Sequence, residues 1–406
     1  MLGAEYDNML ACIRCGLCLT SCPTYVLSLH ESEGPRGRVG MARALAEGHL
    51  DITPDLLEHE SNCLVCDACS AVCPAGVHMD PLQVVLRAAI EPSRHRSVAQ
   101  RVLRGIVFGW LFMDMRRFRL LVRLLWLYQQ LGLRWLARHV GVLRLLRMHD
   151  LDGLLPSLPG RFVVPNGEVS GSGEPAAFFA GCVMSTALAD VDRATLRVLE
   201  RAGYRVTNPR SQGCCGALHA HGGDLVRGKE LARRNIEAFE HTEGPIVVNS
   251  AGCGAMLKDY AHHLGTDSAR AFSARVRDLS QVLPQLPMKR GYARRVVYQD
   301  ACHLLHAQRI SRQPRDLLRS IPGVDLAEID EAGLCCGSAG IYNVTNPNQS
   351  RQLQRRKLDN ALRADPEVIV TANPGCLLQL RAGLAERGST VEVKHIAEVL
   401  DEASAP

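Results

Sequence analysis

Sixteen cysteines stand out in this chain of 406 residues, and eight of them fall in two runs with the same spacing. Each run reads C-x2-C-x2-C-x3-C-P and ends at Pro23 or Pro74. The two-residue gaps let three thiolates converge on one iron–sulfur cubane, while the proline-terminated turn carries the fourth thiolate to the other cluster. The pattern therefore predicts two [4Fe-4S] clusters. Their expected ligands are Cys12, Cys15, Cys18 and Cys73 for one cluster, and Cys63, Cys66, Cys69 and Cys22 for the other.

Zinc sites and disulfides are the alternative uses for clustered cysteines. Four-cysteine zinc sites also contain C-x2-C pairs, but two identical runs of four with a closing proline fit zinc ribbons poorly. The first residues, MLGAEYDNMLACIRC, lack the basic and then apolar segments of a secretion signal. We therefore expect a cytoplasmic protein whose thiols stay reduced and are free to bind iron.

The other eight cysteines form a second pattern, which occurs twice. A single cysteine, a Cys-Cys-Gly triplet and a further cysteine follow one another, and the same order returns about 120 residues later. Glycine next to the paired cysteines lets backbone N–H groups approach a cluster closely. The sequence thus predicts a duplicated domain that could hold one or two further iron–sulfur clusters. The candidate ligands are Cys182, Cys214, Cys215 and Cys253 in the first copy, and Cys302, Cys335, Cys336 and Cys376 in the second.

The elements that carry these cysteines can be inferred from hydrophobic patterning. Short apolar runs such as AAFFAGC and EVIVTANPGC end at a cysteine, and helix-like patterns follow, for example at 186–201 and 349–364. This alternation predicts α/β units with parallel strands, whose sites lie at strand C-termini and in the following loops. Between the two ferredoxin-type runs, a helical stretch at 39–47 favours a mainly helical module.

Length and composition indicate a multidomain folded protein. A chain of 406 residues with 47% hydrophobic and 22% charged residues suits two or three domains. We expect an α+β multidomain fold, with a mainly helical two-cluster ferredoxin domain followed by a duplicated α/β cysteine-rich domain. The expected boundaries are 1–90 for the ferredoxin domain, 91–175 for a helical connector and linker, and 176–290 and 291–406 for the two repeats.

The connector is rich in arginine and aromatic residues. The segment 101–149 contains ten arginines and one acidic residue, Asp114, interleaved with Trp110, Trp126 and Trp135. Basic helices of this kind lie on anionic membrane surfaces, or pack against other domains or a partner subunit with their arginines in solvent. No nucleic-acid motif is present, and no apolar run approaches the ~20 residues of a spanning helix. The Gly-, Ser- and Pro-rich segment 165–175 is expected to be a flexible linker.

Other polar residues near the cysteines have two interpretations each. Arg36 and Arg38 could tune the cluster potentials, or they could pair with Glu31 or Glu33. Four histidines near the paired cysteines could be ligands or proton carriers, or merely polar loop and helix residues, and we do not assign them as ligands. They are His219, His221, His303 and His306.

Taken together, the motifs resemble the cysteine-rich CCG domain family, and within it the iron–sulfur subunits of glycolate oxidase. The resemblance spans nearly the whole chain. It is carried by CIRCGLCLTSCPTY, GPRGR, CLVCDACSAVCPAGV, SQGCCGALHAHGGD, NSAGCGA, EAGLCCGSAGIYNVTNP and TANPGC. It implies an electron-transfer subunit that is not active alone, because an FAD-binding dehydrogenase subunit supplies its electrons. The implied acceptor is a quinone or similar molecule at the inner face of the cell membrane.

One departure separates this chain from heterodisulfide reductase, a related member. There each copy ends in C-x-x-C, whereas here Ser250 and Asn373 occupy the first of those positions, which leaves four cysteines per copy. The departure leaves either an ordinary cluster or none in each copy. The alternative function remains a reductase of the heterodisulfide or glycerol-3-phosphate dehydrogenase type, whose cysteine-rich region is itself the reducing site. No G-x-G-x-x-G motif occurs, so substrate oxidation is expected on a separate flavoprotein.

Overall fold

The computed structural model describes every residue except 1, 146–148 and 284–285. These positions fall within the predicted ranges 1–90, 91–175 and 176–290. The parts of those predictions that concern these positions lie outside the described residues.

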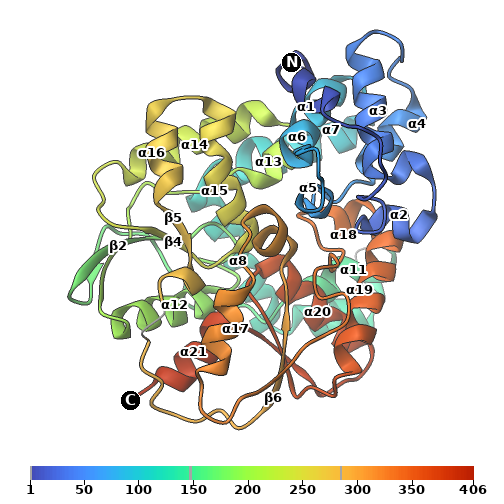
Figure 1. Cartoon of the computed structure of the whole chain (residues 1–406). Helices are drawn as coiled ribbons and strands as arrows, with labels where there is room; N and C mark the ends of the chain where they lie inside the picture. The colour runs from blue at the N-terminus through green and yellow to red at the C-terminus, as the bar shows by residue number, and fades with distance from the viewer. Residues whose placement is uncertain (1, 146–148, 284–285) are drawn as a thin grey trace.

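The N-terminal part is helical, as the sequence predicts (Figure 1). A proline occupies the first helical position of three of its helices, where the missing N–H costs no intrahelical hydrogen bond. Helices α1, α3 and α6 bury Met9, Val39, Leu82 and Leu86 in a small core of their own. The elements are η1 (Leu2–Glu5), α1 (Tyr6–Leu10), α2 (Pro23–Ser28), η2 (Glu31–Glu33), α3 (Pro35–Ala46), α4 (Pro54–Ser61), α5 (Ala68–Ala71) and α6 (Met79–Ile90).

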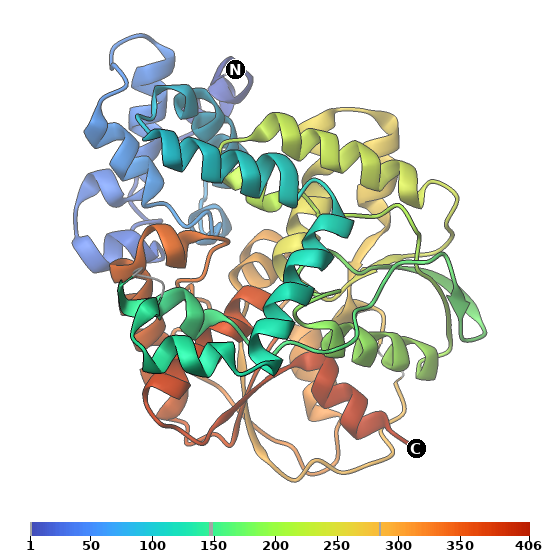
Figure 2. The same cartoon turned by 180° about the vertical axis from the view of Figure 1, so that it is seen from behind.

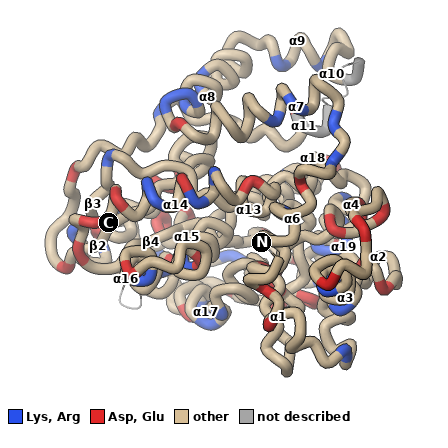
Figure 3. Tube along the Cα trace, turned by 90° about the horizontal axis from the view of Figure 1, so that it is seen from above, with Lys and Arg blue, Asp and Glu red and all other residues tan. Residues whose placement is uncertain are grey.

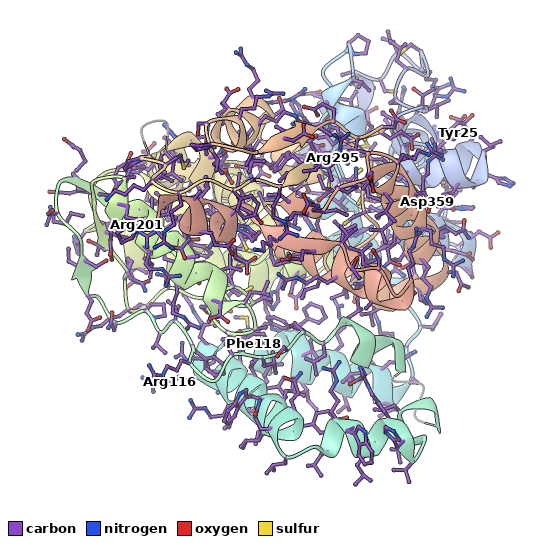
Figure 4. All side chains as sticks on the ribbon, turned by 90° about the horizontal axis from the view of Figure 1, so that it is seen from below. Tyr25, Arg116, Phe118, Arg201, Arg295 and Asp359 are labelled. Atoms are coloured by element: carbon purple, nitrogen blue, oxygen red, sulfur yellow. The ribbon has the colours of Figure 1, made fainter. Side chains whose placement is uncertain are left out.

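A chain of helices then crosses the back of the molecule (Figure 2). Its inner side buries Leu111, Phe118 and Val122 against Cys182 and Cys214 of the first repeat. Figure 4 shows Phe118 on the side that faces the body of the molecule, and Arg116 projecting away from it. The interdomain packing considered from the sequence is therefore present. The elements are η3 (Glu91–Ser93), α7 (Val98–Arg104), the π-helix η4 (Gly105–Leu111), α8 (Met115–Gln130), α9 (Leu133–His139), α10 (Val142–Leu145) and α11 (His149–Leu154).

Two sheets follow, with strand orders β1-β3-β2-β4-β5 and β7-β6-β8-β9. All of their strand pairs are parallel except β1 with β3. Apart from the added edge strand β1, the second order repeats the first, as expected of a duplicated domain. The strands are β1 (Val169–Ser170), β2 (Glu174–Phe179), β3 (Tyr204–Thr207), β4 (Ile246–Val248), β5 (Val276–Asp278), β6 (Arg295–Gln299), β7 (Asp325–Ala327), β8 (Val368–Thr371) and β9 (Glu392–His395).

Helices cover both sheets, and the helical patterns at 186–201 and 349–364 correspond to α12 and α19. The helices of the first repeat are α12 (Ala189–Arg201), α13 (Ala217–His221), α14 (Leu225–Phe239), α15 (Ala251–Leu264), α16 (Asp267–Arg275) and η5 (Leu279–Gln281). In the second they are the π-helix η6 (His303–Ala307), α17 (Arg312–Arg319), α18 (Tyr342–Thr345), α19 (Pro347–Leu362), α20 (Pro374–Glu386) and α21 (Ile396–Ser404).

The two repeats share one hydrophobic core. Phe178 of β2, Val297 of β6 and Leu400 of α21 belong to the same buried cluster. Helix α12 of the first repeat packs against α21 of the second, where Arg201 Nη1 donates to Asp401 Oδ1 at 2.9 Å. The burial of apolar side chains between the two sheets therefore fixes their relative position.

The predicted linker 165–175 differs in part from the expectation. Val169 and Ser170 form the antiparallel edge strand β1 on β3. Gly171 has φ +76°, and a Cβ there would lie 2.3 Å from Tyr204 O, so only glycine allows this close approach. The α+β multidomain class predicted from the sequence is confirmed.

Candidate iron–sulfur sites

The two ferredoxin-type loops fold alike. Arg14 and Val65, each two residues after the first cysteine of its run, have φ of 57° and 50°. Gly16 and Asp67, two residues further on, have φ of 83° and 61°. A β-branched residue such as Val65 rarely adopts a positive φ. Such backbone strain persists only where the surrounding contacts hold it in place, and it is often found at functional sites.

Four cysteines from both runs line one buried cavity. Cys22 comes from the first run, and Cys63, Cys66 and Cys69 come from the second. The backbone N–H of Val65 donates to Cys63 Sγ at 3.4 Å. Burial raises the pKa of the thiols of Cys63, Cys66 and Cys69, so ionising them in this position requires a compensating positive charge such as iron. The donor set and the enclosed cavity fit a four-cysteine cluster.

The other predicted set lies nearer the surface. Cys12 and Cys73 are half-buried against the core of the N-terminal helices, whereas Cys15 is exposed. Burial, with smaller contributions from Cys12 and Cys22, raises the pKa of the Cys18 thiol. The backbone N–H of Val77 donates to Cys73 Sγ at 3.4 Å, a contact of the same kind as that at Cys63.

The two arginines of GPRGR differ in environment. Arg36 pairs with the exposed Glu31, its Nε lying 2.6 Å from Oε1. Arg38 is 1% exposed, donates to Glu33 Oε2 at 2.7 Å, and places Nη1 4.0 Å from Cys22 Sγ. Both therefore form the ion pairs considered from the sequence, and Arg38 also brings positive charge to a cysteine sulfur.

Each cysteine-rich repeat brings its four cysteines together. In the first repeat, Cys182 Sγ lies 3.7 Å from Cys214 Sγ, and Cys215 is hydrogen-bonded to Cys214 and Cys253. Hydrogen bonds from Cys182 and then Cys215 hold the pKa of the Cys214 thiol well below its usual value. Sulfur atoms gathered in this way form the donor set of an iron–sulfur or zinc site.

The second repeat has the same arrangement. Cys336 Sγ lies 3.2 Å from Cys376 Sγ, and Cys335 is hydrogen-bonded to Cys302 and Cys336. Hydrogen bonds from Cys335 and then Cys376 hold the pKa of the Cys336 thiol well below its usual value. All four of these cysteines are buried.

A glycine is required after each cysteine pair. Gly216 and Gly337 have φ of +87° and +84°, a region that glycine enters without strain. A Cβ on Gly337 would lie 2.5 Å from Ser350 O, and one on Gly216 would lie 3.0 Å from Gly228 O. The glycines thus let helices α19 and α14 pack directly against the cysteine pairs.

The last cysteine of each repeat lies in the first turn of a helix. Cys253 is the third residue of α15 and Cys376 the third of α20, where the helix dipole favours a thiolate. The residues in place of a further cysteine are the N-caps, Ser250 and Asn373. Asn373 Nδ2 donates to Cys376 Sγ at 3.6 Å, while its Oδ1 accepts from Gly252 N at 3.1 Å. Asn373 therefore links the two repeats at their cysteine sites.

The second repeat adjoins the N-terminal cysteine cavity. Cys66, Cys302 and Cys335 belong to one buried cluster with Leu64 and Tyr342. The proximity is also electrostatic, because burial and then Cys302 raise the pKa of the Cys66 thiol. The sequence did not reveal this neighbourhood, since no spacing pattern relates residues so far apart in the chain.

Arg87 is a further contributor that the sequence analysis missed. Its guanidinium donates to Cys63 O at 2.5 Å and to His221 O at 2.7 Å, and so joins the cysteine loop to the first repeat. In the sequence, Arg87 is a single arginine among the apolar residues of α6. Such a residue is common in helices and does not by itself indicate a functional site.

The four histidines near the paired cysteines differ in their polar contacts. His219 Nε2 contacts Phe108 O at 2.8 Å, and His306 Nε2 contacts Gly333 O at 2.9 Å. His303 Nδ1 lies 3.6 Å from Cys302 Sγ. Burial opposes a charge on His303, but the neighbouring Cys302 raises its pKa to about 9. His221 lies beside Asp80 instead.

A helical module with two ferredoxin-type cysteine runs, joined to two cysteine-rich repeats, defines a class of iron–sulfur redox proteins. Three family models match the chain. They are a 4Fe-4S dicluster domain at 11–77, the linker region of the glycolate oxidase iron-sulfur subunit at 99–155, and the cysteine-rich CCG domain at 176–258 and 296–381.

Curated relatives extend over nearly the whole chain. The probable glycolate oxidase iron-sulfur subunit of Bacillus subtilis is 39% identical, and the glycolate oxidase iron-sulfur subunit of Escherichia coli is 32% identical. Each match covers 98% of this chain and 95% of the relative. One of the subunits of the fumarate reductase (CoM/CoB) of Methanothermobacter marburgensis is 35% identical, over 55% of this chain and 45% of its own length. The chain belongs to the family of glycolate oxidase iron-sulfur subunits.

Proposed function

We propose that this chain is the iron–sulfur electron-transfer subunit of a flavoprotein 2-hydroxy-acid dehydrogenase, with glycolate as the substrate of the complex. An FAD-binding subunit oxidises the substrate, and its electrons then pass one at a time through this chain toward a quinone or similar acceptor. Family membership supports the role, because relatives of this name match almost the full length of the chain. The subunit is not active without its flavoprotein partner.

The N-terminal module holds two [4Fe-4S] clusters in this proposal. When bound, the clusters supply one-electron carriers, and the protein supplies thiolate ligands, hydrogen bonds and charge. The ligands are Cys12, Cys15, Cys18 and Cys73 for one cluster, and Cys63, Cys66, Cys69 and Cys22 for the other. Four gathered sulfurs in each repeat support further clusters there, held by Cys182, Cys214, Cys215 and Cys253 and by Cys302, Cys335, Cys336 and Cys376.

The observation that carries the proposal is the shared buried cluster of Cys66, Cys302 and Cys335. In this cluster a cysteine of the N-terminal module lies next to cysteines of the second repeat, among apolar side chains. A relay needs such proximity between successive carriers. The Ser250 and Asn373 side chains, which donate hydrogen bonds to sulfur, favour a carrier in the repeats over a disulfide-cleaving site.

A cavity beside Cys63 is where we propose that the acceptor approaches. It has a volume of about 310 Å³ and lies between the N-terminal module and both repeats. Leu64 and Leu218 give it apolar surface, and Arg96 and Arg104 give it positive charge. A planar acceptor with carbonyl oxygens suits a cavity that combines apolar walls with arginine donors.

The connector helices are the proposed contact with the membrane. Within the described residues, no helix is long and apolar enough to cross a bilayer. Arginines nevertheless lie along α7–α9 with few acidic residues among them (Figure 3). Exposed apolar side chains lie between these arginines. This combination matches an anionic lipid surface. The large exposed apolar side chains include Val102, Leu103, Ile106, Trp110, Leu120, Leu124, Leu131, Trp135 and Leu136.

Anaerobic co-purification tests the proposed function. We expect the tagged chain to isolate with an FAD-containing subunit, with at least eight iron and eight sulfide per chain and spin-resonance signals of reduced [4Fe-4S] centres. The complex should reduce a water-soluble quinone with glycolate, whereas the isolated chain should not. Isolated chain that turned over a thiol–disulfide substrate without a flavoprotein would overturn the carrier assignment. Protein without iron and sulfide would overturn the cluster assignment.

The acceptor cavity has its own test. Leu218→Trp should fill the cavity and lower quinone reduction at least tenfold, while a small dye that takes electrons at the surface should be reduced as before. Val226→Trp, on the exposed side of α14, is the matched control and should leave both rates unchanged. Equal loss of both rates in Leu218→Trp would contradict the cavity assignment.

A further inference from the structure

Three side chains from three parts of the chain converge outside the cysteine sites. Asp80 lies in α6 of the N-terminal module, His221 ends α13 of the first repeat, and His303 begins η6 of the second repeat. One ligating atom from each lies within 4.8 Å of the other two. No spacing pattern points to this cluster, because its members are far apart in the chain.

Two of the converging atoms are buried and poorly satisfied. Asp80 is only 7% exposed, and the nearest polar partner given for its Oδ1 is His221 Nε2 at 3.4 Å. The Nε2 of His303 is buried with no hydrogen-bond partner among the described residues, while its Nδ1 faces Cys302 Sγ. A buried polar atom left unsatisfied costs ~1–3 kcal/mol, and more when it is charged, so such atoms call for a missing partner.

The spacing fits a shared metal ion better than a hydrogen bond. His221 Nε2 and Asp80 Oδ1 are 3.4 Å apart, beyond the usual range of ~2.7–3.2 Å for an N–H···O bond. Two ligands at ~2.0–2.1 Å from a tetrahedral zinc ion lie about 3.4 Å from each other. The rings of His221 and His303 have centroids 5.7 Å apart, so both imidazoles can reach the same point.

We propose that Asp80, His221 and His303 bind one zinc ion, in a site separate from the cysteine sulfurs. Two imidazole nitrogens and one carboxylate oxygen are donors that zinc accepts. Each ligand comes from a different part of the chain, so the ion cross-links the N-terminal module and both repeats. It holds the second repeat against the loop of Cys66, where the buried cluster connects the modules. The site does not depend on the proposed electron-transfer function.

Zinc analysis and X-ray absorption of the full-length, iron-loaded protein test this site. After one equivalent of zinc is added anaerobically and the excess is removed, we expect one zinc per chain. Its absorption spectrum should contain only nitrogen and oxygen neighbours at ~2.0–2.1 Å. Sulfur neighbours at ~2.3 Å would place the zinc in a cysteine site and overturn the proposal, as would the absence of retained zinc.

Two variants and a control identify the ligands. Asp80→Asn and His221→Gln should each lower retained zinc at least tenfold while iron and sulfide per chain stay unchanged. His262→Gln is the control, because His262 lies nearby but pairs with Glu5 outside the cluster, and it should retain one zinc. Full zinc retention in both ligand variants would overturn the assignment. If a variant does not fold, the absorption spectrum of the unaltered protein still decides between nitrogen and sulfur ligation.

Discussion

At the scale of single residues, Arg38 is the clearest link between folding and redox chemistry. Its guanidinium is buried, neutralises Glu33, and donates to backbone oxygens of Glu33 and His59. Removing one partner of a buried ion pair costs ~3–5 kcal/mol, because the other charge is left uncompensated. We therefore expect Arg38→Met to lower the free energy of unfolding by that amount, measured by denaturant unfolding under anaerobic conditions.

The same substitution should lower the reduction potential of the cluster assigned to Cys22, since a nearby positive charge favours the reduced, more negative state. A redox titration followed by spin resonance measures this shift. Arg36→Met is the matched control. Its ion pair with Glu31 is partly exposed, and such pairs contribute only ~0–1 kcal/mol. Equal effects in the two variants would show that burial beside Cys22 is not what matters.

Gly337 provides a steric prediction at the same scale. Gly337→Ala forces an L-residue to φ +84° and drives its Cβ into Ser350 O. We expect a loss of at least about 2 kcal/mol in unfolding free energy, together with a lower iron content, because the neighbouring cysteine pair shifts. Gly265 has φ +68° with no atom within 4 Å of a Cβ, so Gly265→Ala isolates the cost of the backbone angle alone. The two variants should differ clearly in iron per chain.

At the scale of elements, the sequence predicted what local patterning controls. The apolar runs before Cys182 and Cys376 became β2 and β8, because a continuous run of small and β-branched residues suits a strand buried on both faces. The edge strand β1 was missed because only two residues pair there. The π-helices η4 and η6 were also missed, since they depend on how the chain packs and leave no periodic signal.

The N-terminus of α21 supports a pH prediction. His395 caps this helix by accepting the Ala397 N–H at 3.1 Å through Nδ1, and burial lowers its pKa to about 4. Protonation is therefore favoured in the unfolded chain, where the pKa is near 6.5. Stability from this group is full above pH 6.5 and falls as the pH drops toward 4, with a loss of about 2 kcal/mol by pH 5.

The measurement compares unfolding at pH 7 and pH 5 in the unaltered protein and in His395→Asn. Asparagine can cap the helix but does not titrate, so the variant should lose about 2 kcal/mol less stability between these pH values. Any acid lability of the bound clusters affects both proteins and cancels in the comparison. Identical pH dependence in the two would mean that His395 is not held neutral in the folded protein.

At the scale of the whole molecule, the cysteine ligands could be assigned to sets from the sequence, but their mutual arrangement could not. Spacing within a run reports how one loop can wrap around a cluster. The contact between Cys66 and Cys302 depends instead on how the N-terminal module docks on the second repeat. Docking of this kind depends on the shapes of the packed surfaces, including the surface formed by Tyr342 and Leu353. Residue spacing does not predict how such surfaces fit together.

The connector gives the molecule one face that differs from the rest. Its inner residues, such as Phe118, pack on the first repeat, while Trp135 and Leu136 are 63% and 49% exposed. We expect the protein to float with vesicles that contain anionic phospholipid and to float less with purely zwitterionic vesicles, since arginine and apolar side chains contribute together. Flotation in a density gradient at low and high salt measures both contributions.

A double variant tests which surface makes this contact. Trp135→Glu with Leu136→Glu removes apolar burial and adds two negative charges, so vesicle binding should fall at least tenfold, equivalent to about 1.4 kcal/mol. Val226→Glu changes a still more exposed apolar residue on α14, which is not part of the connector, and should bind as before. If the unaltered protein stayed at the bottom of the gradient with anionic vesicles, the exposed face would have to be covered by a partner subunit instead. In that case Trp135 and Leu136 would contact the partner subunit instead of lipid. The double variant should then lose that subunit during co-purification.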